Sequence, residues 1–195
     1  MEDNEFEIEW AKMLNGEKYN AVHPEFIRRL QLTRDRIWKF NNIRPTDIEA
    51  QHELLRELLG HLGKNPVINQ PFRCDFGKNI RIGDDTVINF NMTILDEGLV
   101  TIGNHVFIGP NCSVYTPCHP LEAEERDKGV EWAKPVTICD HVWIGGSATI
   151  LPGVTIGEGS VIGAGSVVAK SIPANCVAVG NPCRVIKKIG NPTKE

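Results

Sequence analysis

The chain has 195 residues, of which 41% are hydrophobic, and a formal net charge of −4 at pH 7. That length fits one main domain with an accessory segment, and the acidic balance gives no electrostatic basis for binding nucleic acid or an anionic membrane. The start of the chain lacks the basic and apolar regions of a signal peptide, and no apolar run approaches the roughly 18 residues of a membrane span. We therefore expect a cytoplasmic protein.

The first third of the chain has a helical pattern. Apolar residues recur at three- and four-residue spacing from Phe26 to Phe40, and Pro24 suits a first helical turn. Another helix is predicted to begin at Thr46, because Thr46 and Glu49 have the spacing of a capping box. A shorter helix is expected from about residue 6 to 14. Tyr19, Asn20 or Arg28 could also reach a substrate from this segment.

From Ile138 to Pro173 the sequence repeats every six residues, with Ile or Val at the head of each hexapeptide. Neither a helix nor a long flat strand explains a strict period of six, whereas a coil of short strands joined by tight corners does. Three hexapeptides make a triangular coil, and stacked coils bury a column of Ile and Val and pair their strands in parallel. We expect a mainly β protein, with a parallel β-helix over residues 64–195. Residues 1–63 should form a short α-helical cap, since a bare end of the coil would expose unpaired strand edges.

The same period runs earlier, from Ile82 to Val114, with two departures. A slip of two residues around Asp96 to Gly98 is interpreted as a bulge. After Val114 the in-phase positions hold proline, arginine and tryptophan, which cannot line a narrow apolar column. Residues from about 116 to 135 should therefore leave the coil as an excursion loop, and such loops often carry function. A basic tail from about residue 180 ends the coil.

His119, at the root of this excursion, is the candidate general base, because an imidazole with an ordinary pKa near 6.5 can accept a proton at neutral pH. Asn89 could orient a hydroxyl group or could simply form a turn. Cys118 is a weaker nucleophile candidate, because adjacent side chains diverge. A zinc site would need a second histidine near His119, and the excursion contains none, so no metal is predicted. His105 and His141 occupy matching corner positions that should face solvent.

Several motifs, distributed over nearly the whole chain, resemble those of the maltose and galactoside O-acetyltransferases. They are G-E-x-Y at 16–19, N-F-N-x-T-I-x-D at 89–96, T-x-x-H-P at 116–120, V-W-I-G-G at 142–146, V-I-G-A-G-S-V-V at 161–168 and G-N-P-C-R-V-I-K-K at 180–188. The resemblance implies a left-handed parallel β-helix and a homotrimer with active sites between neighbouring subunits. The handedness comes from the family alone, because the general rule for parallel crossovers favours the right-handed form.

The resemblance also implies transfer of an acetyl group from acetyl-CoA to a hydroxyl of a mono- or disaccharide. His119 matches the catalytic histidine of the family. The positions implied in acceptor binding are Asn89, Asp75, Asp96, Glu97 and Glu131. The positions implied in coenzyme A binding are Trp143, Gly145, Gly146, Ala164, Lys170 and Arg184. Val87 and His23 depart from the pattern, where relatives have tyrosine and aspartate, so the sugar is left open.

Three other functions share some of these features. An acetyltransferase acting on an antibiotic would have the same coil and histidine but matches the helical amino terminus less well. A non-catalytic trimeric scaffold would keep the coil without chemistry, and His119 with Asn89 argues against it. A zinc hydratase would bind metal, which analysis of the purified protein tests.

Overall fold

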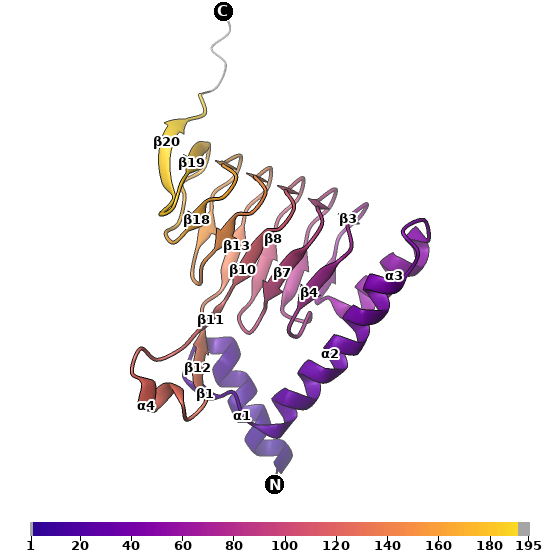
Figure 1. The fold of residues 1–195 in the computed structure, drawn as a ribbon, viewed down its shortest axis with the longest axis vertical. Coiled ribbons are helices and arrows are strands. Elements are labelled where there is room, and N and C mark those ends of the chain that lie inside the picture. The colour runs from indigo at the N-terminus through magenta and orange to yellow at the C-terminus, as the bar shows by residue number, and fades with distance from the viewer. Residues whose placement is uncertain (1, 191–195) are drawn as a thin grey trace, which may run out of the picture.

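The computed structural model describes residues 2–190 and is a three-sided stack of short parallel strands flanked by three long helices (Figure 1). Each side of the stack is one sheet, which we name after its first strand. The strand pairings within these sheets are parallel except at the end of the β3 sheet, where β20 runs antiparallel to β19. The β2 sheet contains β2 (His61–Leu62), β5 (Ile80–Ile82), β8 (Val100–Ile102), β13 (Val136–Ile138) and β16 (Thr155–Ile156). The β3 sheet contains β3 (Val67–Ile68), β6 (Val87–Ile88), β9 (Phe107–Ile108), β14 (Trp143–Ile144), β17 (Val161–Ile162), β19 (Cys176–Val179) and β20 (Arg184–Lys188). The β4 sheet contains β4 (Phe72–Cys74), β7 (Met92–Leu95), β10 (Ser113–Tyr115), β15 (Thr149–Ile150) and β18 (Val167–Val168).

The chain visits the three sheets in turn, so every coil has three corners. The first corner joins the β2 sheet to the β3 sheet, the second joins the β3 sheet to the β4 sheet, and the third returns to the β2 sheet. The leading residues of the hexapeptides point inward and are buried, as in Ile138, Ile144 and Ile150. In-register pairing stacks like residues on like, for example Ile88 on Ile108 and Ile102 on Ile138. The predicted parallel β-helix is confirmed.

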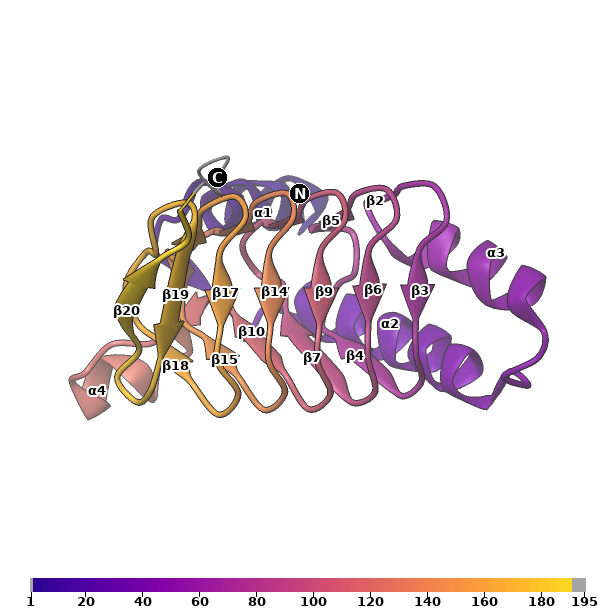
Figure 2. The ribbon, with the colours of Figure 1, turned by 90° about the horizontal axis from the view of Figure 1, so that it is seen from above.

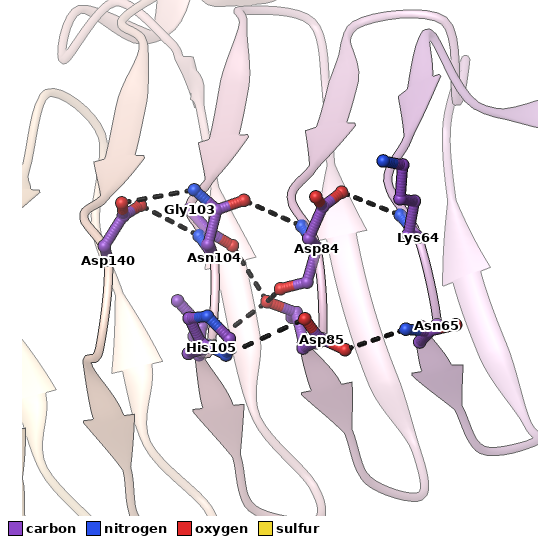
Figure 3. Close-up of polar contacts among 10 residues, drawn as sticks. Lys64, Asn65, Asp84, Asp85, Gly103, Asn104, His105 and Asp140 are labelled. Atoms are coloured by element: carbon purple, nitrogen blue, oxygen red, sulfur yellow. Dashed lines mark hydrogen bonds and ion pairs between the residues drawn. The ribbon is translucent and has the colours of Figure 1, made fainter.

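Polar side chains tie the coils together at the first corner (Figure 3). Asp84 accepts a hydrogen bond from the Lys64 amide at 2.7 Å, and Asn104 accepts one from the Asp84 amide at 2.8 Å. The next residue, His105, is left-handed with φ 53°, a conformation in which Asn, Asp and His are enriched. The His105 ring stacks on His141 with centroids 5.0 Å apart, and both histidines face solvent, as expected.

The three long helices are α1 (Glu2–Asn15), α2 (Pro24–Asn42) and α3 (Ile48–Leu58). Phe40 and Leu58 pack into the core of the coil, so α3 and the end of α2 cover its first turn (Figure 2). The start of α2 and α1 form a second apolar cluster around Phe26. None of the helices within residues 2–190 is both long and apolar enough to cross a membrane.

The helix starts differ in detail from the sequence prediction. α3 is capped by Asp47, which accepts from the Ala50 amide at 3.2 Å, and the predicted start at Thr46 is therefore wrong by one residue. Asp47 serves because its carboxylate reaches the free amides of the first turn. His23 caps α2, with its Nδ1 accepting from the Glu25 amide at 3.2 Å. Its departure from the family pattern thus has a structural role.

The excursion leaves the coil at the third corner, after Tyr115, and returns at Val136. It contains β11 (Pro117–Cys118), the one-turn helix α4 (Ala123–Arg126) and β12 (Val130–Ala133), and β12 pairs antiparallel with both β11 and β1 (Tyr19–Asn20). The two-residue slip near Asp96 is no bulge within a strand. It is a longer third corner between β7 and β8, which leaves the strands in register.

Candidate active site

His119 lies on the excursion immediately after β11, and its side chain is 55% exposed. Its Nε2 is 3.6 Å from Oε2 of Glu131, whose side chain is only 11% exposed. Cys118 pairs with Trp132 across β11 and β12, and this pairing brings their sequence neighbours His119 and Glu131 together. A carboxylate at this distance orients the ring and stabilises its protonated form. The other ring nitrogen is left for a ligand.

Tyr19 holds Glu131 from the opposite side. Its hydroxyl donates to Oε1 of Glu131 at 2.5 Å, and its position in β1 lies directly opposite Glu131 in β12. Tyr19 is only 4% exposed, so it does not reach a substrate as one reading of the sequence suggested. Burial raises the pKa of Glu131, while the Tyr19 hydrogen bond and the nearby His119 act to lower it. The result is a chain from Tyr19 through Glu131 to His119.

Three acidic residues gather at the third corner, where β4 and β7 end. Asp96 has no exposed surface, and its Oδ1 accepts from the amides of Asp75 at 3.0 Å and Phe76 at 2.8 Å. Its other oxygen accepts from the Asn79 amide at 3.3 Å. Asp96 therefore links the third corners of two successive coils, and its side chain is not accessible to an acceptor substrate.

Glu97 is better placed for a ligand than Asp96. It is 9% exposed, and its Oε2 has no hydrogen-bond partner among the residues that the structure describes. Burial and the neighbouring Asp75 raise its pKa and so favour the neutral carboxyl group, which can donate a hydrogen bond as well as accept one. Asp75 itself is half-buried.

A second group of predicted residues lies along the second corner. Asn89 follows β6 there, and Gly145 and Gly146 follow β14. The coils approach closely at this edge, since a Cβ on Gly145 would lie 2.6 Å from the Ala164 nitrogen. Small residues on successive coils thus form a strip with little side-chain bulk, which we call the track.

Trp143 and Arg184 flank this track, whereas Lys170 does not. Trp143 points outward from β14 and is 57% exposed. Arg184 lies in β20 opposite Val179 and is exposed at the end of the track. Lys170 follows β18 and so belongs to the third corner, apart from the other predicted coenzyme A residues.

His119 and Asn89 stand on different edges of the coil. One side of a hexapeptide coil holds about six residues at about 3.3 Å each, so neighbouring edges are roughly 15–20 Å apart. Within one chain, therefore, the candidate base and this predicted acceptor-binding residue are not brought together by the coil.

Comparison with known proteins agrees with this architecture. The maltose acetyltransferase hexapeptide capping motif matches residues 12–63, and the bacterial transferase hexapeptide motif, of six repeats, matches residues 135–170. Galactoside O-acetyltransferase of Escherichia coli (strain K12) is 44% identical over 158 residues, which cover 81% of this chain and 78% of that protein. The chain belongs to the maltose and galactoside O-acetyltransferase family.

Solved structures of related proteins share the fold. The maltose O-acetyltransferase of Clostridium difficile 630 superposes with a TM-score of 0.92 at 44% identity, covering 94% of this chain and 98% of that one. A hexapeptide-repeat acetyltransferase of Vibrio cholerae O1 biovar eltor, solved with acetyl-coenzyme A, superposes at 0.87 with 39% identity and coverage of 94% and 99%. This O-acetyltransferase family member is thus an acyltransferase with the predicted left-handed parallel β-helix. Among residues 2–190, no three His, Cys, Asp or Glu side chains are grouped to hold a metal ion.

Proposed function

We propose that this protein transfers the acetyl group of acetyl-CoA to a hydroxyl of a mono- or disaccharide, with His119 as the general base. The observation that carries the proposal is the chain from Tyr19 through Glu131 to His119, which ends in an exposed imidazole beside a carboxyl cluster. A half-exposed ring backed by a buried carboxylate is the arrangement expected of a general base. We propose the cytoplasm as its location.

The reaction is a direct transfer. As the sugar oxygen attacks the thioester carbonyl carbon, His119 takes the hydroxyl proton, and Glu131 stabilises the imidazolium that forms. The carbon–sulfur bond then breaks, and the proton passes to the departing thiolate to give coenzyme A and the acetyl ester. No covalent intermediate on the protein is needed, so ping-pong kinetics would count against this scheme.

The carboxyl groups of the third corner suit the acceptor. Asp75 can accept hydrogen bonds from sugar hydroxyls, and the neutral Glu97 can both donate and accept. Glu131, which the resemblance also implied as an acceptor contact, is almost fully occupied by Tyr19 and His119. We propose that Glu131 positions the base and that Asp75, Glu97 and Asn89 bind the acceptor.

The track along the second corner suits coenzyme A. Small residues such as Gly145, Gly146 and Ala164 leave room for the narrow pantetheine arm, and Trp143 offers an aromatic flank. Arg184 can bind a phosphate through its planar guanidinium. Lys170 would reach the same coenzyme only from a neighbouring copy, because it lies on another edge.

We further propose a homotrimer in which the third corner of one chain faces the second corner of the next. The outer face of the β3 sheet is apolar in register, with Val87, Phe107, Trp143 and Val161 on successive coils. Phe107 and Trp143 are each more than half exposed in a single chain, which is typical of a surface that a partner covers. Leu121, at the far end of the excursion, is 90% exposed and would lie over the neighbour.

Release of free thiol from acetyl-CoA tests the proposal directly. The acceptors would be glucosides, galactosides, maltose and chloramphenicol, with wild type and His119→Ala assayed together. We expect turnover on a sugar that falls by about 10²–10⁴ in the variant, as for the loss of a general base. Turnover on chloramphenicol alone would favour the antibiotic-modifying function. An equally active variant would remove His119 from the mechanism.

A further inference from the structure

A groove of about 410 Å³ lies between α2 and the outer face of the β4 sheet. Its walls include Arg34 and Trp38 from α2 and Arg73 from β4. Asp75 and Leu95, at the ends of β4 and β7, form the part of the groove nearest the third corner. None of the assignments above uses Arg34, Trp38 or Arg73.

Trp38 presents a large aromatic surface to solvent. Its side chain is 67% exposed, whereas the neighbouring Ile37 on the same helix is buried in the core. An indole face in a groove is suited to stack against a flat apolar surface, such as the C–H face of a sugar ring. The polar edge of that ring would then point toward the groove walls.

Arg34 and Arg73 supply hydrogen-bond donors beside that aromatic surface. Both are exposed, and within residues 2–190 neither forms a salt bridge or a side-chain hydrogen bond. Arg28 and Arg29, about one and a half turns before Arg34 on α2, are both bonded to Glu25. The groove arginines therefore keep their donors available, and guanidinium groups bind pairs of oxygens well.

Asp75 belongs to both the groove and the carboxyl cluster. Its backbone amide is bonded to Asp96, which fixes its place, and its carboxyl group lies close enough to Glu97 to raise the pKa of that residue. A ligand in the groove would thus lie next to the position proposed for the reacting hydroxyl. Asp75 also acts on the pKa of Glu131, the partner of His119, so it links the groove to the candidate base.

We propose that this groove binds the unit of the acceptor that is not acetylated, with its ring against Trp38 and its hydroxyls bonded to Arg34 and Arg73. The preferred acceptor is accordingly a disaccharide or longer saccharide. This inference rests on the proposed function and narrows its substrate class.

A larger cavity of about 940 Å³ near the first coil is a weaker candidate for this role. Two of its amide side chains are engaged within the protein, since Gln51 donates to the Arg44 carbonyl and Gln70 to the Ile43 carbonyl, each at 3.0 Å. Its lining also lacks any residue of the carboxyl cluster.

The test compares two acceptors built from the same sugar, methyl glucoside and maltose, by their kcat/KM. Wild type should prefer maltose, and Trp38→Ala should lower kcat/KM for maltose roughly tenfold, the size of one lost aromatic contact. The value for methyl glucoside should change less than about twofold, and Trp38→Phe should recover most of the loss on maltose. Leu32→Ala, an exposed apolar residue of α2 outside the groove, is the matched control.

Equilibrium binding of maltose to His119→Ala separates the groove from the chemistry. Binding that is lost in Trp38→Ala/His119→Ala supports the groove even if wild type acetylates no sugar, in which case only the proposed function fails. Equal losses on both acceptors in Trp38→Ala, no preference for maltose, or unchanged binding in the double variant would each overturn the inference.

Discussion

At the scale of single residues, the chemistry depends on how Glu131 is held. Its carboxylate must be ionised to stabilise the protonated His119, yet burial raises the pKa of Glu131. The hydrogen bond from Tyr19 opposes this rise because it favours the charged form. Tyr19 thus widens the pH range in which Glu131 stays ionised and can stabilise the protonated His119.

Tyr19→Phe should therefore move the acidic limb of the pH profile of kcat to higher pH. Without the phenol the pKa of Glu131 rises further, so the carboxylate is lost sooner as the pH falls. At neutral pH we expect a fall in kcat of roughly tenfold, in the lower range for loss of a supporting hydrogen bond. Tyr115→Phe, which changes the only other tyrosine of the chain, should leave the profile unchanged. An unshifted limb in Tyr19→Phe would separate Tyr19 from the base.

At the scale of elements, the third corner is organised by Asp96. Burial raises the pKa of Asp96 to about 7, against the three backbone amides that favour its ionised form. A carboxyl whose pKa is higher in the folded state makes the protein more stable when protonated. This contribution is present below about pH 4 and is lost as the pH rises toward 7.

Substitution of Asp96 tests this assignment in urea unfolding. Asp96→Ala leaves buried amides without partners and should lower the free energy of unfolding by about 1–3 kcal/mol or more. Asp96→Asn keeps one acceptor oxygen, so it should cost less and should flatten the fall in stability between pH 5 and pH 7. If Asp96→Ala unfolds like wild type but loses acetyl transfer, Asp96 contacts the substrate after all.

The coil could be predicted from the sequence because its period is local. Each hexapeptide carries its own buried residue and corner, so Ile138, Ile144 and Ile150 could be placed on three successive sides by counting. The chain from Tyr19 to Glu131 could not, since it joins residues 112 positions apart through β1 and β12. The sequence motif that contains Asp96 placed this residue near the candidate site. It did not show that the Asp96 carboxylate points into the protein, because that orientation depends on backbone amides of the previous coil.

At the scale of the whole molecule, the apolar face of the β3 sheet has a direct consequence for assembly. Phe107→Asp places an unpaired carboxylate in the proposed interface. Burying this charge should reduce the free energy of association by about 3–5 kcal/mol per subunit interface. Sedimentation should show dissociation to monomers together with loss of acetyl transfer, because each site needs two chains. Thr101→Asp, at a corresponding outward position on the β2 sheet, should remain trimeric and active. A trimeric Phe107→Asp would place the interface elsewhere.

The central claim is that His119 of one chain works with Asn89 of another, and mixed oligomers test it most directly. His119→Ala and Asn89→Ala should each be nearly inactive alone. Co-refolded in equal amounts, they should recover about a quarter of wild-type activity, because a random cyclic trimer pairs an intact His119 with an intact Asn89 at that fraction of its interfaces. Mixtures that stay inactive, although mass spectrometry shows that the two variants have mixed within trimers, would contradict the shared site.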